Sequence, residues 1–163
     1  MLADKIAVRD WIRNKIGEEY LIPIYGTYDS FDEIDFDRLP DQFVIKTNHS
    51  SGWNIVVKDK LTFDKNAARK KITKWLSRNY AFWTEYEPHY SGITPRILIE
   101  KYMEDSTGGL TDYKFLCFDS EAKYVWVDFD RFTHHKRNIY DMNWNLQPWN
   151  QYTYGNYEGG TAA

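Results

Sequence analysis

The stretch that decides the fold begins with Phe43-Val44-Ile45-Lys46-Thr47, passes through Asn48-His49-Ser50-Ser51-Gly52, and ends with Trp53-Asn54-Ile55-Val56-Val57-Lys58. Two short apolar runs around a small, polar, glycine-containing segment are typical of a β-hairpin. Lys46 lies midway along the first run, where burying a lysine is unfavourable unless it meets an anion. Two interpretations stay open: the loop binds phosphate through backbone N–H groups and Lys46, or the strand is amphipathic and Lys46 is solvated.

Helix and strand patterns continue on both sides of this hairpin. Apolar residues at helical spacing predict helices over residues 4–16 and 64–79, the second with Asp64 as its N-cap. Further strands are predicted over residues 96–103, 112–118 and 123–130, with a turn at 119–122. Helices separated from paired antiparallel strands indicate an α+β fold with two lobes, and not a doubly wound parallel sheet.

We expect four parts along the chain. These are an N-terminal helix with an acidic linker over residues 1–42, a first lobe over 43–95, a second lobe over 96–149, and a weakly ordered tail over 150–163. Six carboxylates within residues 29–41 predict a solvated surface loop or short helix. The tail is rich in Tyr, Gly and Asn, a composition that favours weak order.

Composition excludes several classes of protein. The 163 residues are 42% hydrophobic and 28% charged, so the chain should fold. A net charge of −3 argues against general nucleic-acid binding by phosphate neutralisation. The single cysteine, Cys117, excludes an internal disulfide and is expected to pack in the core. Neither a signal peptide nor a membrane-length apolar run is present, so we expect a cytoplasmic protein.

Aromatic residues make up 18% of the chain. Large rings supply core volume, and when exposed they also stack on sugar rings. A carbohydrate-binding module is therefore an alternative function. Its first candidates for stacking are Trp53, Trp83, Trp144 and Trp149.

A second motif lies where the apolar run Ile97-Leu98-Ile99 meets Glu100-Lys101-Tyr102-Met103-Glu104. This pattern is typical of a buried strand that emerges at the edge of a cleft. Backbone groups at such an exit can bind the polar edge of a purine, and carboxylates can bind ribose hydroxyls. The alternative is an edge strand with solvated charges.

Two further motifs carry charge. Strand alternation places Asp112 and Lys114 on one face, and Asp128 and Asp130 together on the next strand. Carboxylates suit Mg²⁺, which would bridge phosphate oxygens, although a cross-strand salt bridge is the alternative. The cationic run His134-His135-Lys136-Arg137 either binds an anionic substrate or forms a solvated basic loop.

In this order, the motifs resemble the ATP-grasp fold, and more narrowly its teichuronopeptide-biosynthesis (TupA-like) branch. The resemblance covers most of residues 4–149. The stretches that carry it are Asp4-Lys5 with Val8-Arg9, Phe43 to Lys46, Asn48-His49, Ser51 to Asn54, Arg96 to Tyr102, Asp112 to Phe115 with Cys117-Phe118, and Asp128 to Arg131 leading into His135 to Asn138.

The resemblance implies that ATP and Mg²⁺ bind between two lobes of antiparallel strands with flanking helices. The implied phosphate contacts are Lys46, the loop Ser50-Ser51-Gly52, Lys114 and, more weakly, Lys58. Glu100, Lys101, Tyr102 and Met103 would face adenine, and Glu104 or Asp112 the ribose. Lys114 and Arg131 are the implied catalytic residues, Asp128 and Asp130 the candidate metal ligands, and His135, Lys136 and Arg137 the candidate substrate contacts.

The implied reaction joins a carboxylate to an amine through an acyl phosphate, in the biosynthesis of a surface polysaccharide of the cell wall or capsule. The carboxylate would belong to an anionic sugar or an amino acid. The family's principal Mg²⁺ ligands lie on late strands, beyond the stretches matched here, so the C-terminal part of the fold is expected to be missing. An inactive nucleotide-binding fragment and a glycosyltransferase-associated polysaccharide domain stay open as alternatives.

Overall fold

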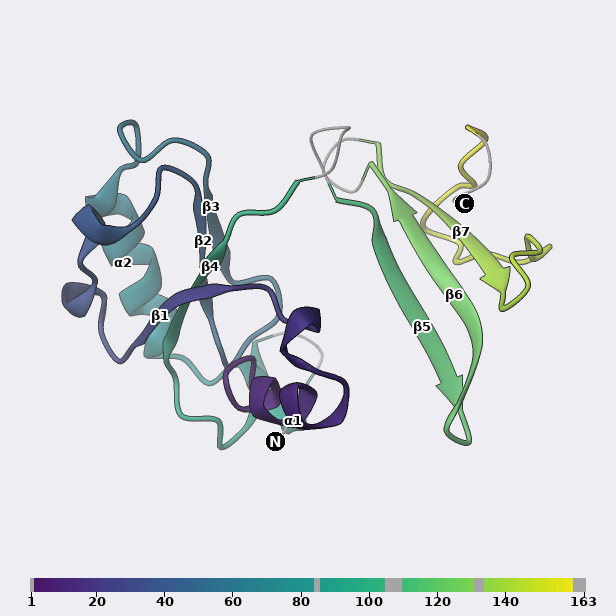
Figure 1. Ribbon diagram of the computed structural model, residues 1–163, viewed down its shortest axis with the longest axis horizontal. Helices are drawn as coiled ribbons and strands as arrows, with labels where there is room; N and C mark the ends of the chain where they lie inside the picture. Colours follow the sequence, from purple (N-terminus) through teal and green to yellow (C-terminus); the bar gives the residue numbers. More distant parts are fainter. Residues whose placement is uncertain (1, 84–85, 105–109, 131–133, 160–163) are drawn as a thin grey trace. The chain divides into compact units, whose positions relative to one another are not determined.

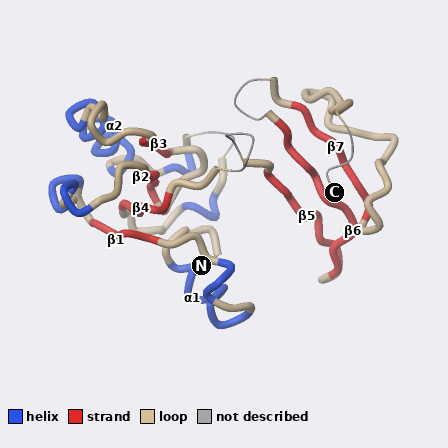
Figure 2. The backbone as a smooth tube through the Cα atoms, turned by 45° about the horizontal axis from the view of Figure 1, so that its top comes forward, coloured by secondary structure: helices blue, strands red, loops and turns tan. Residues whose placement is uncertain are grey.

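Two antiparallel β-sheets organise the chain, a four-stranded sheet in the unit Met1–Tyr102 and a three-stranded sheet in the unit Met103–Ala163 (Figure 1). The computed structural model describes residues 2–83, 86–104, 110–130 and 134–159. Among these residues, α-helices occur only in the first unit (Figure 2). The predicted α+β class with antiparallel strands is confirmed, and each unit is described by itself below.

The first sheet contains the predicted hairpin. Its strands are β1 (Ile24–Tyr28), β2 (Phe43–Thr47), β3 (Asn54–Val57) and β4 (Ile97–Lys101), in the order β1-β4-β2-β3. Lys46 pairs with Asn54 across the hairpin and with Leu98 on β4. The predicted boundary between the two lobes lies after residue 95. In the structure the chain divides after Tyr102, because β4 is a central strand of the first sheet.

The two helices lie on opposite faces of this sheet. Helix α2 (Lys65–Leu76) begins after Asp64, whose carboxylate accepts hydrogen bonds from the backbone N–H groups of Asn66 and Ala67, so the predicted N-cap is confirmed. Its buried face packs against Ile97 and Ile99 of β4. Strand alternation directs Glu100 to the opposite face of the sheet from Ile97 and Ile99. There Arg9 of helix α1 (Ala7–Lys15) forms an ion pair with it. Both faces of β4 are therefore covered.

The acidic segment over residues 29–41 forms short helices, one of the two predicted forms, but its apolar side chains enter the core, so the segment is not solvated throughout. Two short 3₁₀ helices, η2 (Phe31–Glu33) and η3 (Phe36–Arg38), turn its apolar side chains inward. The residues that enter the core are Phe31, Ile34, Phe36 and Leu39. The carboxylates between them are exposed, so the segment is amphipathic at short range. The other 3₁₀ helices are η1 (Glu18–Tyr20), η4 (Tyr80–Phe82) and η5 (Pro88–Tyr90).

The second sheet has the order β5-β6-β7, with β5 (Asp112–Phe118), β6 (Glu121–Phe129) and β7 (Lys136–Asp141). The turn between β5 and β6 is the pair Asp119-Ser120, with φ of 49° and 66°, which is typical of a tight two-residue hairpin and shorter than predicted. Strand β7 was not predicted. Cys117 is exposed on β5, so the expectation of a packed core thiol is wrong.

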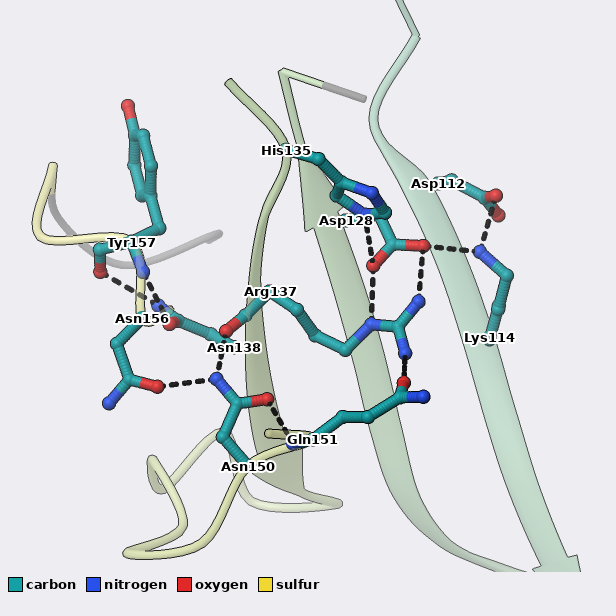
Figure 3. A network of polar contacts seen from close by, with 10 residues as sticks. All are labelled: Asp112, Lys114, Asp128, His135, Arg137, Asn138, Asn150, Gln151, Asn156 and Tyr157. Atoms are coloured by element: carbon teal, nitrogen blue, oxygen red, sulfur yellow. Dashed lines mark hydrogen bonds and ion pairs between the residues drawn. The ribbon is translucent and has the colours of Figure 1, made fainter. Parts of the chain in front are cut away.

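The described part of the C-terminal segment is attached to strand β7, which differs from the weakly ordered tail expected over residues 150–163. The backbone N–H of Arg137 donates to the Gly155 carbonyl at 3.2 Å. The Asn138 amide pairs with both backbone groups of Tyr157, at 3.1 and 2.9 Å (Figure 3). Tyr157 also stacks on Phe129, with ring centroids 4.2 Å apart. The C-terminal segment is therefore attached along β7 by side-chain amide hydrogen bonds and ring stacking, and not as a further strand.

Candidate functional site

The first polar cluster lies on the face of the four-stranded sheet that carries α1. We call Lys5, Arg9, Lys46 and Glu100 the Glu100 cluster. Val44 pairs with Glu100 and Lys46 with Leu98, so Lys46 and Glu100 are diagonal neighbours on one face. The Lys46 ammonium forms an ion pair with Glu100 Oε2, and Arg9 Nη1 lies 3.6 Å from Glu100 Oε1.

Positive charge exceeds negative charge in this cluster. The Lys5 ammonium donates a hydrogen bond to the Ser50 carbonyl. Burial and the neighbouring charge of Lys46 lower the pKa of Lys5. Arg9 Nε is buried and has no hydrogen-bond partner among the described residues, while Arg9 Nη2 donates to the Ile22 carbonyl at 2.7 Å. The three cationic side chains face two carboxylates, Glu100 and the nearby Asp4, and the remaining positive charge favours an additional anion.

The loop after Lys46 has a buried half and an exposed half. Asn48 is 1% exposed and connects the loop to the N-terminus and to the residues before β4, through contacts to Asp4 Oδ1 at 3.1 Å and the Thr94 carbonyl at 3.0 Å. The Ser50 hydroxyl is also buried and lies 2.5 Å from the Thr47 hydroxyl. Ser51 and Gly52 are exposed, and Gly52 has a φ of 75°, which favours glycine. Within the predicted phosphate loop, the exposed groups are therefore at Ser51 and Gly52.

Two residues of the predicted adenine site, Lys101 and Tyr102, line one cavity at the end of the first sheet. The cavity has a volume of about 570 Å³ and is lined by Tyr25, Pro40, Asp41, Gln42, Lys58, Asp59, Lys101 and Tyr102. Lys58 Nζ lies 5.6 Å from the centroid of the Tyr102 ring. Glu100 belongs to the Glu100 cluster instead. Met103 and Glu104 are exposed and begin the second unit.

A second polar cluster lies on the three-stranded sheet (Figure 3). We call Asp112, Lys114, Asp128, His135 and Arg137 the Asp128 cluster. The Lys114 ammonium lies 2.5 Å from both Asp112 Oδ2 and Asp128 Oδ2, so the cross-strand ion pair considered for these residues is present. His135 Nε2 lies 3.1 Å from Asp128 Oδ1, and Arg137 donates to both Asp128 oxygens, at 2.5 and 2.9 Å. Asp128 is therefore the centre of the cluster.

Asp128 is fixed as a carboxylate in this environment. Its side chain is 1% exposed. Burial alone would raise the pKa of Asp128, but hydrogen bonds from Arg137 and Lys114 hold that pKa far below its ordinary range. The carboxylate is charged at neutral pH, and Lys114 and Arg137 compensate its charge.

The Arg137 guanidinium contacts polar groups and aromatic rings. Besides Asp128, its guanidinium donates to the side-chain oxygen of Gln151, and its Cζ lies 4.5 Å from the Trp126 ring centroid and 4.7 Å from that of Tyr154. The basic run 134–137 is thus divided: Arg137 is buried, His135 is half-buried, and Lys136 is exposed. A solvated basic loop does not describe this segment, because Lys136 and Arg137 belong to β7.

The predicted metal ligands do not form a site that suits Mg²⁺. Two cationic side chains, Lys114 and Arg137, already pair with Asp128, and His135 Nε2 lies 3.1 Å from it. Asp130 follows the end of β6 with a φ of 48°, so strand alternation does not extend to it. Across residues 2–83, 86–104, 110–130 and 134–159, no three His, Cys, Asp or Glu side chains are placed to share a metal ion. Arg131, the other predicted catalytic residue, lies outside the described residues.

The aromatic candidates for sugar stacking differ in exposure. Trp53 is 8% exposed and stacks on Trp75 with centroids 5.8 Å apart, so its faces pack in the protein. Trp83, Trp144 and Trp149 are 52%, 42% and 43% exposed. Each of them also contacts another aromatic ring at its edge. Trp53 is therefore not available to stack on a sugar ring.

Lys5 and Arg9 were not predicted as members of a site. Their spacing of four residues in a predicted helix would place both on one helix face, which is the signal that could have revealed them. Their partners, Ser50 and Glu100, come from distant segments that only the fold brings together. Lys46 and Lys114, expected at one nucleotide, belong to the first and second unit respectively.

Comparison with known proteins gives one match. A sequence model for a family described as "TupA-like ATPgrasp" matches residues 1–160, nearly the whole chain. Searches among curated proteins and among solved structures returned no match. In the described residues, no helix has the length and apolar character needed to cross a membrane.

Proposed function

The chain belongs to the TupA-like ATP-grasp family, and on this basis we propose that it is an ATP-dependent carboxylate–amine ligase domain. Family membership supports the coarse class of the reaction. Bound ATP would supply the phosphoryl group that converts a carboxylate into an acyl phosphate, which an amine then attacks to give an amide and inorganic phosphate. The chain's own contribution is to bind, orient and neutralise charge, as in other phosphoryl transfers.

The observation that carries the proposal is the excess positive charge of the Glu100 cluster. Lys46 is 26% exposed, so its ammonium is accessible at the sheet surface while Glu100 orients it. Arg9 Nε and the cation Lys5 lie beside it, and the exposed backbone at Ser51 and Gly52 follows. A phosphate group would compensate this charge and occupy the donor of Arg9 that has no partner in the described residues. We assign Lys46, Ser51 and Gly52 to the phosphates, with Ser50 supporting the loop from inside.

The 570 Å³ cavity supports the proposed adenine site. Lys101 and Tyr102 line it directly after the buried part of β4, and Lys58 faces the Tyr102 ring. We propose that adenine binds against Tyr102, with the Met103 backbone beside it. The proposed ribose contacts are Glu104 or Asp112.

In the second unit we propose that Lys114 binds a phosphate group. Asp112 and Asp128 use two of its three N–H donors, which fixes the ammonium in place. His135 and Lys136 are proposed to contact the anionic substrate, together with Arg131. The contacts of Arg137 support a different role, namely positioning Asp128 and therefore Lys114. The described residues offer no fitting Mg²⁺ site, so no step of the proposal depends on Asp128 or Asp130 as ligands.

The finer assignments rest on the family alone. We propose a uronic-acid or amino-acid carboxylate as substrate, a pathway that builds a surface polysaccharide of the cell wall or capsule, and action in the cytoplasm, where ATP is available.

Thermal unfolding in the presence of ATP tests the proposal. At ten times Kd, ATP would add about 1.4 kcal/mol and raise Tm by about 4 °C. Lys46→Ala should remove this shift, whereas the control Lys70→Ala, on the exposed face of α2, should keep it. An unchanged Tm of the unsubstituted chain at millimolar ATP would contradict the proposal. Quenching of tryptophan fluorescence by oligosaccharides without a response to ATP would favour a carbohydrate-binding module instead.

A further inference from the structure

The side of helix α2 that faces away from the first sheet carries a stripe of positive charge. Residues 65–78 contain six lysines and arginines and no acidic residue, in a chain whose net charge is −3. Ala68 and Ile72 hold the buried side of the helix in the core. Away from these two residues, four of the six cations recur at spacings of three or four residues, which places them on one side of the helix. These four are Lys70, Lys71, Lys74 and Arg78.

Little negative charge compensates this stripe. Its three lysines are exposed, and Arg78 is half-buried. In the described part of the chain none of the four cations forms an ion pair, whereas Arg69, on the flank of the same helix, lies 2.7 Å from Asp32 Oδ1. Uncompensated charge of one sign on one face of a protein attracts a partner of the opposite charge.

Exposed aromatic rings continue the stripe beyond the end of α2. The Cζ atom of Arg78 lies 4.0 Å from the centroid of the Trp83 ring, which is 52% exposed. Phe82 and Tyr86 are 67% and 62% exposed, and their ring centroids are 5.5 Å apart. Exposed rings beside cations are typical of proteins at a membrane surface, where the rings lie at the level of the headgroups and the charges stay in the polar layer.

We propose that the four cations of the stripe, together with Phe82, Trp83 and Tyr86, form a docking surface for a membrane of anionic phospholipids. We call these seven residues the α2 surface. Its ammonium and guanidinium groups bind lipid phosphates, and its rings enter the headgroup layer. Docking needs neither ATP nor the Glu100 cluster, so this inference does not depend on the proposed function.

The shape of the α2 surface favours a membrane over a nucleic acid. Its cations stand on the outward side of a single helix, which is convex, whereas single-stranded nucleic acids are bound in a positively charged groove. The Phe82 ring is exposed and has no polar atom, and the boundary between headgroups and acyl chains offers it an apolar environment. A lipid surface therefore suits both the charge and the exposed rings.

Sedimentation with lipid vesicles tests the proposal in the full chain without ATP. Vesicles of phosphatidylcholine alone are compared with vesicles of equal parts phosphatidylcholine and phosphatidylglycerol. We expect the chain to bind the anionic vesicles at least about tenfold more tightly, and added salt to weaken this binding. Equal binding to both vesicles, or equally tight binding to a single-stranded oligonucleotide, would overturn the proposal.

Two double substitutions with the same change in net charge locate the contact. Lys70→Gln with Lys74→Gln removes two exposed lysines of the α2 surface and should weaken binding to the anionic vesicles at least about tenfold. The control, Lys15→Gln with Lys123→Gln, removes two exposed lysines elsewhere and should weaken binding by less than about threefold. Equal losses in the two variants would show that the α2 surface is not the contact.

Quenching of tryptophan fluorescence by brominated acyl chains tests whether the rings enter the lipid. We expect anionic vesicles of such lipids to quench the fluorescence of the unsubstituted chain, and Trp83→Phe, which keeps an aromatic ring, to lose at least about half of that quenching. The control Trp149→Phe changes an exposed ring of the second unit and should keep the quenching. Full quenching in Trp83→Phe would contradict the proposed place of the rings.

Discussion

The Glu100 cluster and the Asp128 cluster both pair a nearly buried carboxylate with cations, but they differ in how fully those cations are compensated. In each, a nearly buried carboxylate pairs with two cations: Glu100 with Lys46 of β2 and Arg9 of α1, and Asp128 with Lys114 of β5 and Arg137 of β7. Around Asp128, the guanidinium of Arg137 is compensated by the carboxylate, by Gln151 and by two aromatic rings. Around Glu100, Lys5, Arg9 and Lys46 exceed the available negative charge, and Arg9 Nε has no partner in the described residues. The comparison teaches that a binding site is indicated by cationic side chains that nearby carboxylates do not fully compensate, more than by the presence of charge.

The largest expected effect follows from breaking the complete cluster. Asp128→Asn leaves Arg137, 5% exposed, without its carboxylate, which should lower the free energy of unfolding by about 3–5 kcal/mol. Urea denaturation at pH 7 measures this difference. The control Glu121→Gln removes an exposed carboxylate paired with Lys123 and should change stability by less than about 1 kcal/mol. Equal effects of the two substitutions would show that the Asp128 cluster is not a structural centre.

Acid sensitivity should follow the same carboxylate. Since the folded-state pKa of Asp128 is depressed, its stabilisation is fully present above the unfolded carboxyl pKa of about 4 and is lost as the pH falls below it. The unsubstituted chain should therefore lose more stability between neutral and acidic pH than Asp128→Asn does. Parallel pH profiles of the two proteins would contradict this account.

A substitution in the Glu100 cluster should weaken ligand binding more than it lowers the free energy of unfolding. Lys46→Met leaves Glu100 paired with Arg9 and removes a side chain that is 26% exposed, so the free energy of unfolding should fall by only about 1 kcal/mol. Urea denaturation beside Asp128→Asn gives the comparison directly. A loss as large as that of Asp128→Asn would mean that the two clusters do not differ in the way described.

A smaller pH effect is expected from His49 in the first unit. Burial lowers its pKa, so the neutral ring stabilises the fold above the unfolded histidine pKa of about 6.5, and this contribution is lost as the pH falls below that value. His49→Gln should flatten the stability profile between about pH 7 and 5. The control is His89→Gln, a change of an exposed side chain that should alter the free energy of unfolding at pH 7 by less than about 0.5 kcal/mol.

The smallest expected effect concerns the loop at Gly52. Its φ of 75° disfavours a side chain, but a Cβ there would meet no atom within 4 Å, so Gly52→Ala should cost only about 1 kcal/mol, from the backbone alone. Gly52→Asn should cost less, because Asn adopts positive φ more readily. Thermal unfolding checks both, and a larger loss for Asn than for Ala would refute the backbone explanation.

Local patterns allowed much of the first unit to be predicted. The hairpin of β2 and β3 and the Asp64 cap depend on residues close in sequence, and both are present. The apolar residues of the acidic segment could not be assigned to the core, because a short 3₁₀ turn has no long period to detect. The place of β4 was missed for another reason: its pairing with β1 and β2 spans long sequence separations.

The candidate site shows the same division between local and distant information. Lys46 could be identified as a lysine in need of an anion, and the family resemblance supplied a phosphate as that anion. Its protein partner is Glu100, which lies 54 residues away. Strand β7 was not predicted because Arg137 and Asn138 are polar residues typical of a surface. They are buried only through their contacts with Asp128 and with the segment around Tyr157.

Titration calorimetry with ATP tests most directly whether the Glu100 cluster is the phosphate site. The unsubstituted chain and Lys46→Ala are compared at equal salt concentration, after urea denaturation has shown that both are folded. Our account predicts that the dissociation constant for ATP rises at least about tenfold in Lys46→Ala. The same dissociation constant in both proteins would contradict it.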